Sequence, residues 1–275
     1  MFVPEKIIRK FPKLNSSVLE KNLNLPSGKN KMILDTDTAN EIDDQFALAW
    51  TLLSPDKIDL LGVTAEPYSF QHHREELIES YNIIVNKQNI DNTNKELISN
   101  YSGWVNGLIE SNINPKDIYF DTPEEGVEKS YKEIINIFNK LDIDYNGKVF
   151  RGSPRYLDSY EKPIESQSSQ FIIDTCLKYP DEKIYVCAIG CLTNIASALL
   201  INPEIIKNMV VVWTAGFPTY SFNHNKNSLN LVQDVYASQL LFECGVANVY
   251  LPGFNVGAQL TLSLPDMKEF VKGRG

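Results

Sequence analysis

Short apolar runs alternate with longer amphipathic segments along most of the chain. In those segments apolar residues recur every three or four positions, the spacing of a helix with one buried face. Strands are expected at residues 32–35, 58–64, 148–153 with an exit loop, 183–188, 209–213 and 247–251. Helices are expected at residues 17–23, 43–53, 70–84, 122–141, 166–178, 235–243 and 265–272. This alternation predicts an α/β fold with a mostly parallel open sheet of at least six strands, flanked by helices.

Acidic residues gather where the first apolar run meets the first long helix. Asp35 and Asp37 follow Met32–Leu34, and Asp43 and Asp44 stand just before the helix. In an open α/β sheet this turn lies at the carboxyl end of a strand, where ligands bind. Unpaired carboxylates repel one another, and a hard divalent cation such as Ca²⁺ removes the conflict by binding their oxygens. The alternative, acids that favour a helix N-terminus, explains one or two of them but not Asp35 and Asp37.

The segment Asp35-Thr36-Asp37, a short loop and Asp43-Asp44 resembles the N-terminal motif of the calcium-dependent nucleoside hydrolases (inosine-uridine-preferring nucleoside N-ribohydrolases). The loop at residues 38–42 matches the longer-loop branch of that family. A second turn, Gly190-Cys191-Leu192-Thr193-Asn194-Ile195-Ala196, is similar to the family's strand-to-helix motif Gly-x-Leu-Thr-Asn-hydrophobic-Ala. The resemblance implies that Ile189, just before this glycine, offers its backbone carbonyl to the calcium ion.

The resemblance implies hydrolysis of the N-glycosidic bond of ribonucleosides to free base and ribose by a metal-activated water, with Ca²⁺ as cofactor. Asp37 would be the general base and, with Asp44 and Ile189, a metal ligand. Asp35 would orient the other acids through hydrogen bonds. The residues assigned to the ribose hydroxyls are Asn40, Asp43 and Asn230.

Asn230 is assigned from spacing within the polar loop that follows the fifth strand. Leu229-Asn230 with Asp234 four residues on matches the family's Phe-Asn…Asp pattern. The family's glutamate falls on Ser228, which is a departure. After the second strand the family's ribose-contacting asparagine has no clear counterpart. Glu66 is the polar candidate there, and a helix-capping acid is an equal alternative.

Three further groups of residues are left with open roles. The leaving base needs protonation or stacking, and the candidates are Tyr68, His72, His73 and His224. Arg151, after the third strand, either points at the site or pairs with surface acids, and the second is favoured. A haloacid-dehalogenase-like phosphatase using Mg²⁺ would also suit an Asp-x-Asp motif. That family prefers Thr or Val two residues on, where this chain has Ala39.

The expected domain organisation is an N-terminal arm, residues 1–30, on the surface or at a subunit contact, followed by one hydrolase-like domain, residues 31–275. A polar, Asn-rich stretch within about 70–118 is interpreted as an insertion or lid. Family members continue further and donate a last acid to the calcium. Here only Asp266 and Glu269 follow Asn255, so the C-terminal part is expected to be missing. A truncated or degenerate hydrolase fold that binds a ligand without turnover is the alternative.

Net charge, the length of apolar runs and the spacing of the cysteines limit the classes of partner expected for this protein. The net charge of −9 argues against nucleic acid and anionic membranes, and no apolar run is long enough to cross a bilayer. Cys176, Cys187, Cys191 and Cys244 lack zinc-site spacing and are interpreted as reduced residues of a cytoplasmic protein. The resemblance implies a ribonucleoside substrate and a homo-oligomer.

Overall fold

Six parallel strands form one sheet in the spatial order β3-β2-β1-β4-β5-β6. The computed structural model describes residues 2–218, 220–221 and 228–273. The strands are β1 Asn30–Thr36, β2 Ile58–Ala65, β3 Val149–Phe150, β4 Ile184–Ala188, β5 Met209–Thr214 and β6 Ala247–Leu251. Every neighbouring pair runs parallel, so the predicted parallel sheet is confirmed. The chain order reverses between β1 and β4, and such a switch point is where open α/β sheets bind ligands.

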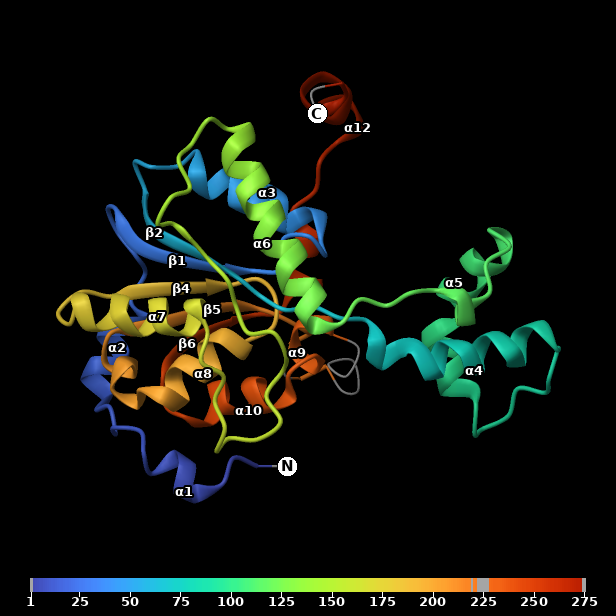
Figure 1. Ribbon diagram of the computed structural model, residues 1–275, viewed down its shortest axis with the longest axis horizontal. Helices are drawn as coiled ribbons and strands as arrows, with labels where there is room; N and C mark the ends of the chain where they lie inside the picture. The colour runs from blue at the N-terminus through green and yellow to red at the C-terminus, as the bar shows by residue number, and fades with distance from the viewer. Residues whose placement is uncertain (1, 219, 222–227, 274–275) are drawn as a thin grey trace.

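Helices cover both faces of this sheet, with α3 and α6 on one side and α7, α8 and α10 on the other (Figure 1). Alternate residues of a strand point to opposite faces, so Ile33 enters one hydrophobic cluster and Leu34 enters the other. The helices are α1 Glu5–Ile8, α2 Ser16–Leu23, α3 Ile42–Leu52, α4 Arg74–Val85, α5 Lys95–Glu110, α6 Pro123–Lys140, α7 Gln167–Lys178, α8 Thr193–Ile201, α9 Leu229–Val232, α10 Val235–Glu243, α11 Gly253–Val256 and α12 Leu264–Asp266. None of the described helices is long and apolar enough to span a membrane.

The segment before β1 is anchored to the body of the molecule. Val3, Ile7 and Phe11 are buried in the hydrophobic cluster that lies under α7, α8 and α10. This differs from an arm lying on the surface. Short stretches in which apolar residues are four apart give too weak a pattern to show burial from sequence alone.

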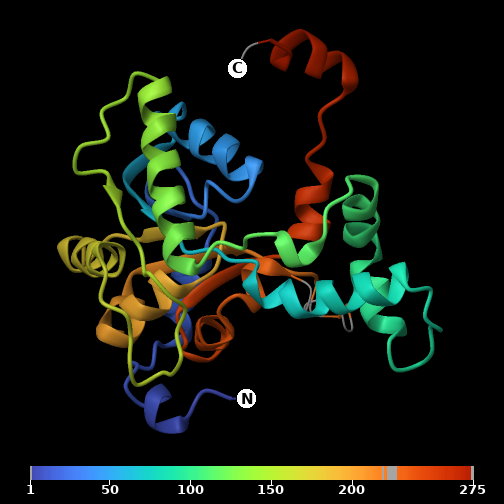
Figure 2. The ribbon, with the colours of Figure 1, turned by 45° about the vertical axis from the view of Figure 1, so that its right-hand side comes forward.

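The stretch expected as an insertion contains two helices, α4 and α5, which pack as a hairpin that projects from the sheet (Figure 2). The hairpin has a small hydrophobic cluster of its own, centred on Leu77, Tyr101 and Val105. Helix α5 was not expected, although its buried residues Tyr101, Val105 and Leu108 recur at helical spacing, because the asparagine-rich composition of this stretch favoured a loop. A lid function for this hairpin stays a prediction.

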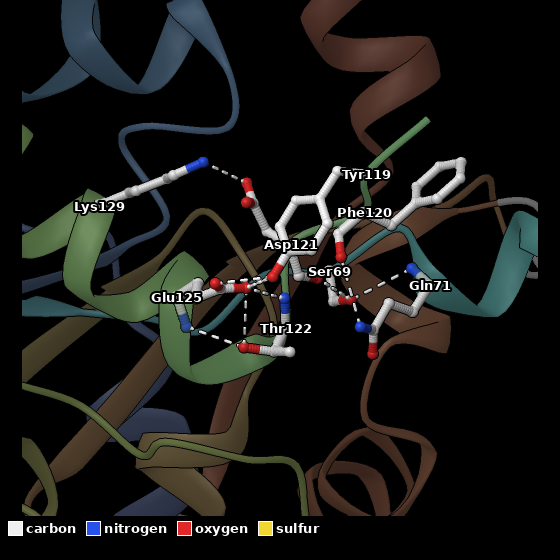
Figure 3. A network of polar contacts seen from close by, with 8 residues as sticks. All are labelled: Ser69, Gln71, Tyr119, Phe120, Asp121, Thr122, Glu125 and Lys129. Atoms are coloured by element: carbon white, nitrogen blue, oxygen red, sulfur yellow. Dashed lines mark hydrogen bonds and ion pairs between the residues drawn. The ribbon is translucent and has the colours of Figure 1, made fainter. Parts of the chain in front are cut away.

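Polar contacts fix the hairpin where its two connections meet the body (Figure 3). Ser69 Oγ donates to the Asp121 carbonyl at 2.7 Å, and Gln71 Nε2 donates to the Phe120 carbonyl at 3.3 Å. Just beyond, Thr122 and Glu125 form a capping box at the start of α6. The entering and leaving chains are therefore tied to each other before the hairpin begins.

Asn194, at the start of α8, connects the ends of three strands. Its Nδ2 donates to Asp35 Oδ1 and to the Ala65 carbonyl, both at 2.9 Å, and its Oδ1 accepts from the Ser153 N–H at 2.9 Å. The side chain is completely buried. Asn194, a residue of the second family motif, is therefore a cross-link between β1, β2 and the loop after β3.

Replacing Asn194 with alanine should remove three buried hydrogen bonds, although Asp35 Oδ1 keeps the Thr64 hydroxyl as a donor. At about 1 kcal/mol for each lost bond, Asn194→Ala should lower the free energy of unfolding by about 2–3 kcal/mol. The measurement is urea denaturation followed by circular dichroism. Asn136→Ala, on the exposed face of α6 with a bond only to Glu133, is the matched control and should change it by less than about 0.5 kcal/mol. Equal effects of the two variants would contradict the cross-link.

Gly126 is required by close packing of α6 on the chain after β2. A Cβ at this position would lie 2.9 Å from Tyr68 N and closer still to Tyr68 O. Gly126→Ala should therefore cost about 1–3 kcal/mol of stability through overpacking. A Cβ on Gly107, in α5, would meet no atom within 4 Å, so Gly107→Ala should be neutral or stabilising by up to about 1 kcal/mol. Denaturant titration of both variants checks the contrast, and a destabilised Gly107→Ala would undermine it.

Candidate active site

The acidic motif lies at the switch point of the sheet. Asp35, in β1, is in register with Thr64 of β2 and Ala188 of β4. The Ile189 N–H donates to the Asp35 carbonyl at 2.9 Å, and the Glu66 N–H donates to the Thr36 carbonyl at 2.8 Å. The backbone of three neighbouring strand ends is thus held together where the carboxylates gather.

Asp37 is positioned by the loop that follows β1. The Asn40 N–H donates to the Asp37 carbonyl at 2.7 Å, and Asn40 Nδ2 donates to Asp37 Oδ2 at 3.0 Å. The other carboxylate oxygen, Oδ1, is buried and has no hydrogen-bond partner. Burial raises the pKa of Asp37 to about 7. The loop therefore holds one oxygen and leaves the other ready for a ligand.

Asp44 lies in the first turn of α3, buried beside Asp37, whereas Asp43 in the same turn is exposed. The Thr36 hydroxyl donates to Asp44 Oδ1. Burial, and then the negative charge of Asp37, raise the pKa of Asp44 to about 9. No side chain caps α3, so capping does not account for these acids.

Asn230 and Ile189 lie next to each other, and they form a hydrogen bond with each other. Asn230 Nδ2 donates to the Ile189 carbonyl at 2.8 Å and to the Thr214 carbonyl at 3.0 Å. The carbonyl expected to serve a metal thus already accepts one hydrogen bond, although a carbonyl oxygen has a second lone pair. Both amide hydrogens of Asn230 are used, and its Oδ1 is left as the acceptor.

Ser228 and Asp234, which flank Asn230 in the sequence, form hydrogen bonds that stabilise this part of the chain. Ser228, at the position of the family's glutamate, accepts a hydrogen bond from the Gly216 N–H at 2.7 Å. Asp234 Oδ2 accepts from the Thr193 hydroxyl at 2.7 Å and from the Leu157 N–H at 2.9 Å, which ties α10 to the start of α8. The spacing of Ser228, Asn230 and Asp234 therefore has a structural basis in these contacts.

The candidates for the leaving group lie at the base of the α4–α5 hairpin. His73 Nδ1 is 2.7 Å from the Tyr101 hydroxyl, which donates to Glu76 Oε2 at 2.6 Å. Since the tyrosine proton goes to Glu76, Nδ1 of His73 must donate its own proton. The histidines line a cavity of about 710 Å³ that also contacts Val232 of α9. Tyr68 is buried after β2, and His224 lies outside the described residues.

Arg151 pairs with surface groups, as favoured from the sequence. Its Nε is 2.9 Å from Glu128 Oε1, and its guanidinium lies 3.7 Å from the centre of the Tyr131 ring. Asp266 and Glu269 lie on the C-terminal helical segment, which stands apart from the sheet in Figure 1. All four cysteines are unpaired.

Glu66 is a candidate site residue whose role sequence reasoning left undecided. It follows β2 directly and is completely buried, and among the described residues neither carboxylate oxygen accepts a hydrogen bond from an N–H or hydroxyl group. Burial and the neighbouring charge of Asp35 raise its pKa well above the ordinary value. The helices after β2 have no side-chain cap, so the capping alternative is wrong. The signal in the sequence was an acid at the end of an otherwise apolar strand.

The buried carboxylate oxygens at the carboxyl ends of β1 and β2 suit a hard divalent cation. Buried carboxylate oxygens without a partner are Asp35 Oδ2, Asp37 Oδ1 and both oxygens of Glu66. Within residues 2–218, 220–221 and 228–273, no three His, Cys, Asp or Glu side chains form a ready-made metal cluster. The donor chemistry thus fits Ca²⁺ or Mg²⁺, with further oxygens needed from backbone, water or substrate.

The chain was compared with known proteins. Residues 32–273 match the family model "Inosine-uridine preferring nucleoside hydrolase". A probable uridine nucleosidase 2 of Arabidopsis thaliana is 29% identical over 152 residues, which cover 54% of this chain and 46% of that protein. Among solved structures, a purine-preferring ribonucleoside hydrolase from Gardnerella vaginalis is similar with a TM-score of 0.55 at 21% identity, covering 87% of this chain and 66% of that chain. A plant nucleoside hydrolase is similar with a TM-score of 0.52 at 18% identity, covering 87% and 64%.

The chain thus spans about half of the plant protein's length and just under two thirds of each neighbouring structure. The two structures share its fold. The family match, in contrast, extends over nearly all of the sequence and includes both strand-to-helix turns described above, which a phosphatase of the haloacid-dehalogenase type does not explain. The chain belongs to the inosine-uridine preferring nucleoside hydrolase family.

Proposed function

We propose that this chain hydrolyses the N-glycosidic bond of ribonucleosides, with Asp37 as general base and Ca²⁺ as cofactor. The observation that supports this most is Asp37 Oδ1, a buried, unpartnered oxygen at the switch point of a nucleoside-hydrolase fold. Members of the family are generally metal-dependent. The Arabidopsis relative is named as a probable uridine nucleosidase and the Gardnerella structure as a purine-preferring hydrolase, so the base preference stays open.

Asp37 and Asp44 would hold the cation, together with the Ile189 carbonyl through its second lone pair. When bound, a divalent cation lowers the pKa of a water molecule toward neutrality. Asn40 Nδ2 donates to Asp37 Oδ2, and Oδ1 has no protein donor. Each carboxylate oxygen has more than one lone pair, so Asp37 would be able both to hold the cation and to accept the proton of the attacking water.

The ribose would be held by Asn40, Asp43 and Asn230. Asn230 uses both amide hydrogens on backbone carbonyls, so its fixed Oδ1 can accept a hydrogen bond from a sugar hydroxyl. The exposed carboxylate of Asp43 lies one residue before the buried Asp44 and can accept another. Hydrogen bonds to the sugar that strengthen as positive charge develops on its ring favour the oxocarbenium-like transition state.

His73 is a leaving-group candidate whose ring is held by a hydrogen bond. Its Nδ1 is fixed by the Tyr101–Glu76 hydrogen-bond chain, so an added proton has to reside on Nε2. That nitrogen is the one from which a departing base could be protonated. The homo-oligomer and the cytoplasmic location remain predictions from the family resemblance and the cysteine content.

Removing the general base should abolish turnover. Asp37→Asn should reduce ribose release from inosine and uridine by about 10²- to 10⁴-fold, measured as reducing sugar with added Ca²⁺ and with EDTA. Asp174→Asn, an acid of α7 that contacts only Gln170 among the residues described, is the control and should retain full activity. Calcium binding by the wild type without any release would instead favour a ligand-binding protein without turnover.

Removing a ribose contact should change the choice between sugars. Asp43→Ala should lower kcat/KM for ribonucleosides by tenfold or more, while the already low value for 2′-deoxyribonucleosides changes less, because a site that pairs with a hydroxyl rejects the analogue lacking it. Parallel assays with uridine and 2′-deoxyuridine check this. A uniform loss on both substrates would remove Asp43 from sugar recognition.

A further inference from the structure

Glu66 is a carboxylate buried among other acids. It is completely buried, and among the described residues no N–H or hydroxyl group donates to Oε1 or Oε2. The one side chain in hydrogen-bonding contact is the carboxyl of Asp35, which can share a proton with Glu66 only while one of the two acids is protonated. The carboxyl of Asp37 and the thiol of Cys191 are its other neighbouring groups. A buried carboxylate among other carboxylates costs several kcal/mol unless a cation or hydrogen bonds compensate for the lost water.

The glycine that opens the second family motif shows how near Glu66 comes to Asp37. A Cβ built on Gly190 would lie within 2.6 Å of both Glu66 Oε2 and Asp37 Oδ1. The two oxygens are therefore at most twice that distance, 5.2 Å, apart. Ca²⁺ binds its oxygens at about 2.3–2.6 Å, so one ion can hold two oxygens up to about 5.2 Å apart. Both oxygens are unpartnered, and Gly190 has no side chain between them.

We propose that Glu66 is a ligand of the same divalent cation as Asp37. This inference rests on the proposed function and goes beyond the ligands that the family resemblance assigns, namely Asp37, Asp44 and Ile189. The family's residue in this loop is an asparagine that contacts ribose. A glutamate is longer and charged, and in this chain it turns toward the Asp37 carboxylate. The cation site of this protein thus has an additional carboxylate from the end of β2.

The test is calorimetric titration of Ca²⁺ into the metal-free chain, compared between the wild type and variants of Glu66. Glu66→Gln keeps the shape of the side chain and removes its charge, and should weaken Ca²⁺ binding by roughly tenfold or more. Glu66→Asp keeps the charge but shortens the reach, and should also weaken binding. Glu41→Gln is the matched control, because Glu41 is an exposed acid of the same edge, four residues from Asp37; it should change affinity by less than about threefold.

Thermal unfolding gives a second readout that is independent of turnover. Without Ca²⁺, Glu66→Gln should melt at the same temperature as the wild type or higher, because one of several buried acids has been neutralised. With Ca²⁺, its gain in melting temperature should be smaller than that of the wild type, since stabilisation follows the affinity of the ligand. Circular dichroism verifies that each variant is folded, and if one is not, the other variant provides the test.

The possible outcomes separate this proposal from the proposed function. If the wild type binds Ca²⁺ and Glu66→Gln binds it with the same affinity, the role of Glu66 is overturned. The proposed hydrolase activity is not affected by that result. If Glu66→Asp binds Ca²⁺ as tightly as the wild type while Glu66→Gln binds it weakly, only the charge of residue 66 matters. That result also overturns direct ligation by Glu66. A wild type that releases ribose equally well with EDTA and binds no Ca²⁺ overturns both the cation and the role of Glu66.

Discussion

Burial of several carboxylates at one edge of a parallel sheet is the constraint on which the rest of this structure depends. The acids concerned are Asp35, Asp37, Asp44 and Glu66, each no more than 4% exposed. Removing such charges from water is unfavourable unless donors or a cation replace the lost hydration. The protein supplies donors to some of the oxygens and leaves others unsatisfied. An edge built in this way is stable only where the surrounding backbone is rigid.

That rigidity comes from cross-links between strand ends rather than from the loops themselves. Asn194 connects Asp35, the Ala65 carbonyl and the Ser153 N–H, and the Thr64 hydroxyl donates to Asp35 Oδ1 at 2.6 Å. Asp35 therefore acts as the central acceptor that holds β1, β2 and α8 in register. Asp37, two residues later, has fewer protein donors, which is the difference expected between an acid that supports the site and an acid that acts in it.

The sheet was predictable from the sequence because strands covered on both faces are nearly continuous apolar runs. The prediction missed α5, although Tyr101, Val105 and Leu108 recur at helical spacing, because the asparagine-rich composition of the stretch favoured a loop. It also missed the burial of the N-terminal segment, where three buried apolar residues are too few to form a pattern. The paired motifs predicted that Asp37, Asp44 and Ile189 lie at the same edge of the sheet; their role as metal ligands stays a prediction. They did not predict that Asn230 donates to Ile189 or that Glu66 faces Asp37, because both depend on side-chain directions set by packing across strands that are distant in sequence.

The two ends of the proposed substrate would be recognised by parts of the molecule with different origins. The sugar end faces the strand ends, where side-chain positions are fixed by the parallel register and by buried hydrogen bonds. The base end would face the cavity between the α4–α5 hairpin and Val232, whose ordering depends on the hairpin's own small cluster and on the contacts of Ser69 and Gln71 at its base. Changes in the hairpin can alter that cavity without disturbing the carboxylates. Under the proposed function, substitutions in the hairpin would therefore change the base preference of this chain without changing which bond it cleaves.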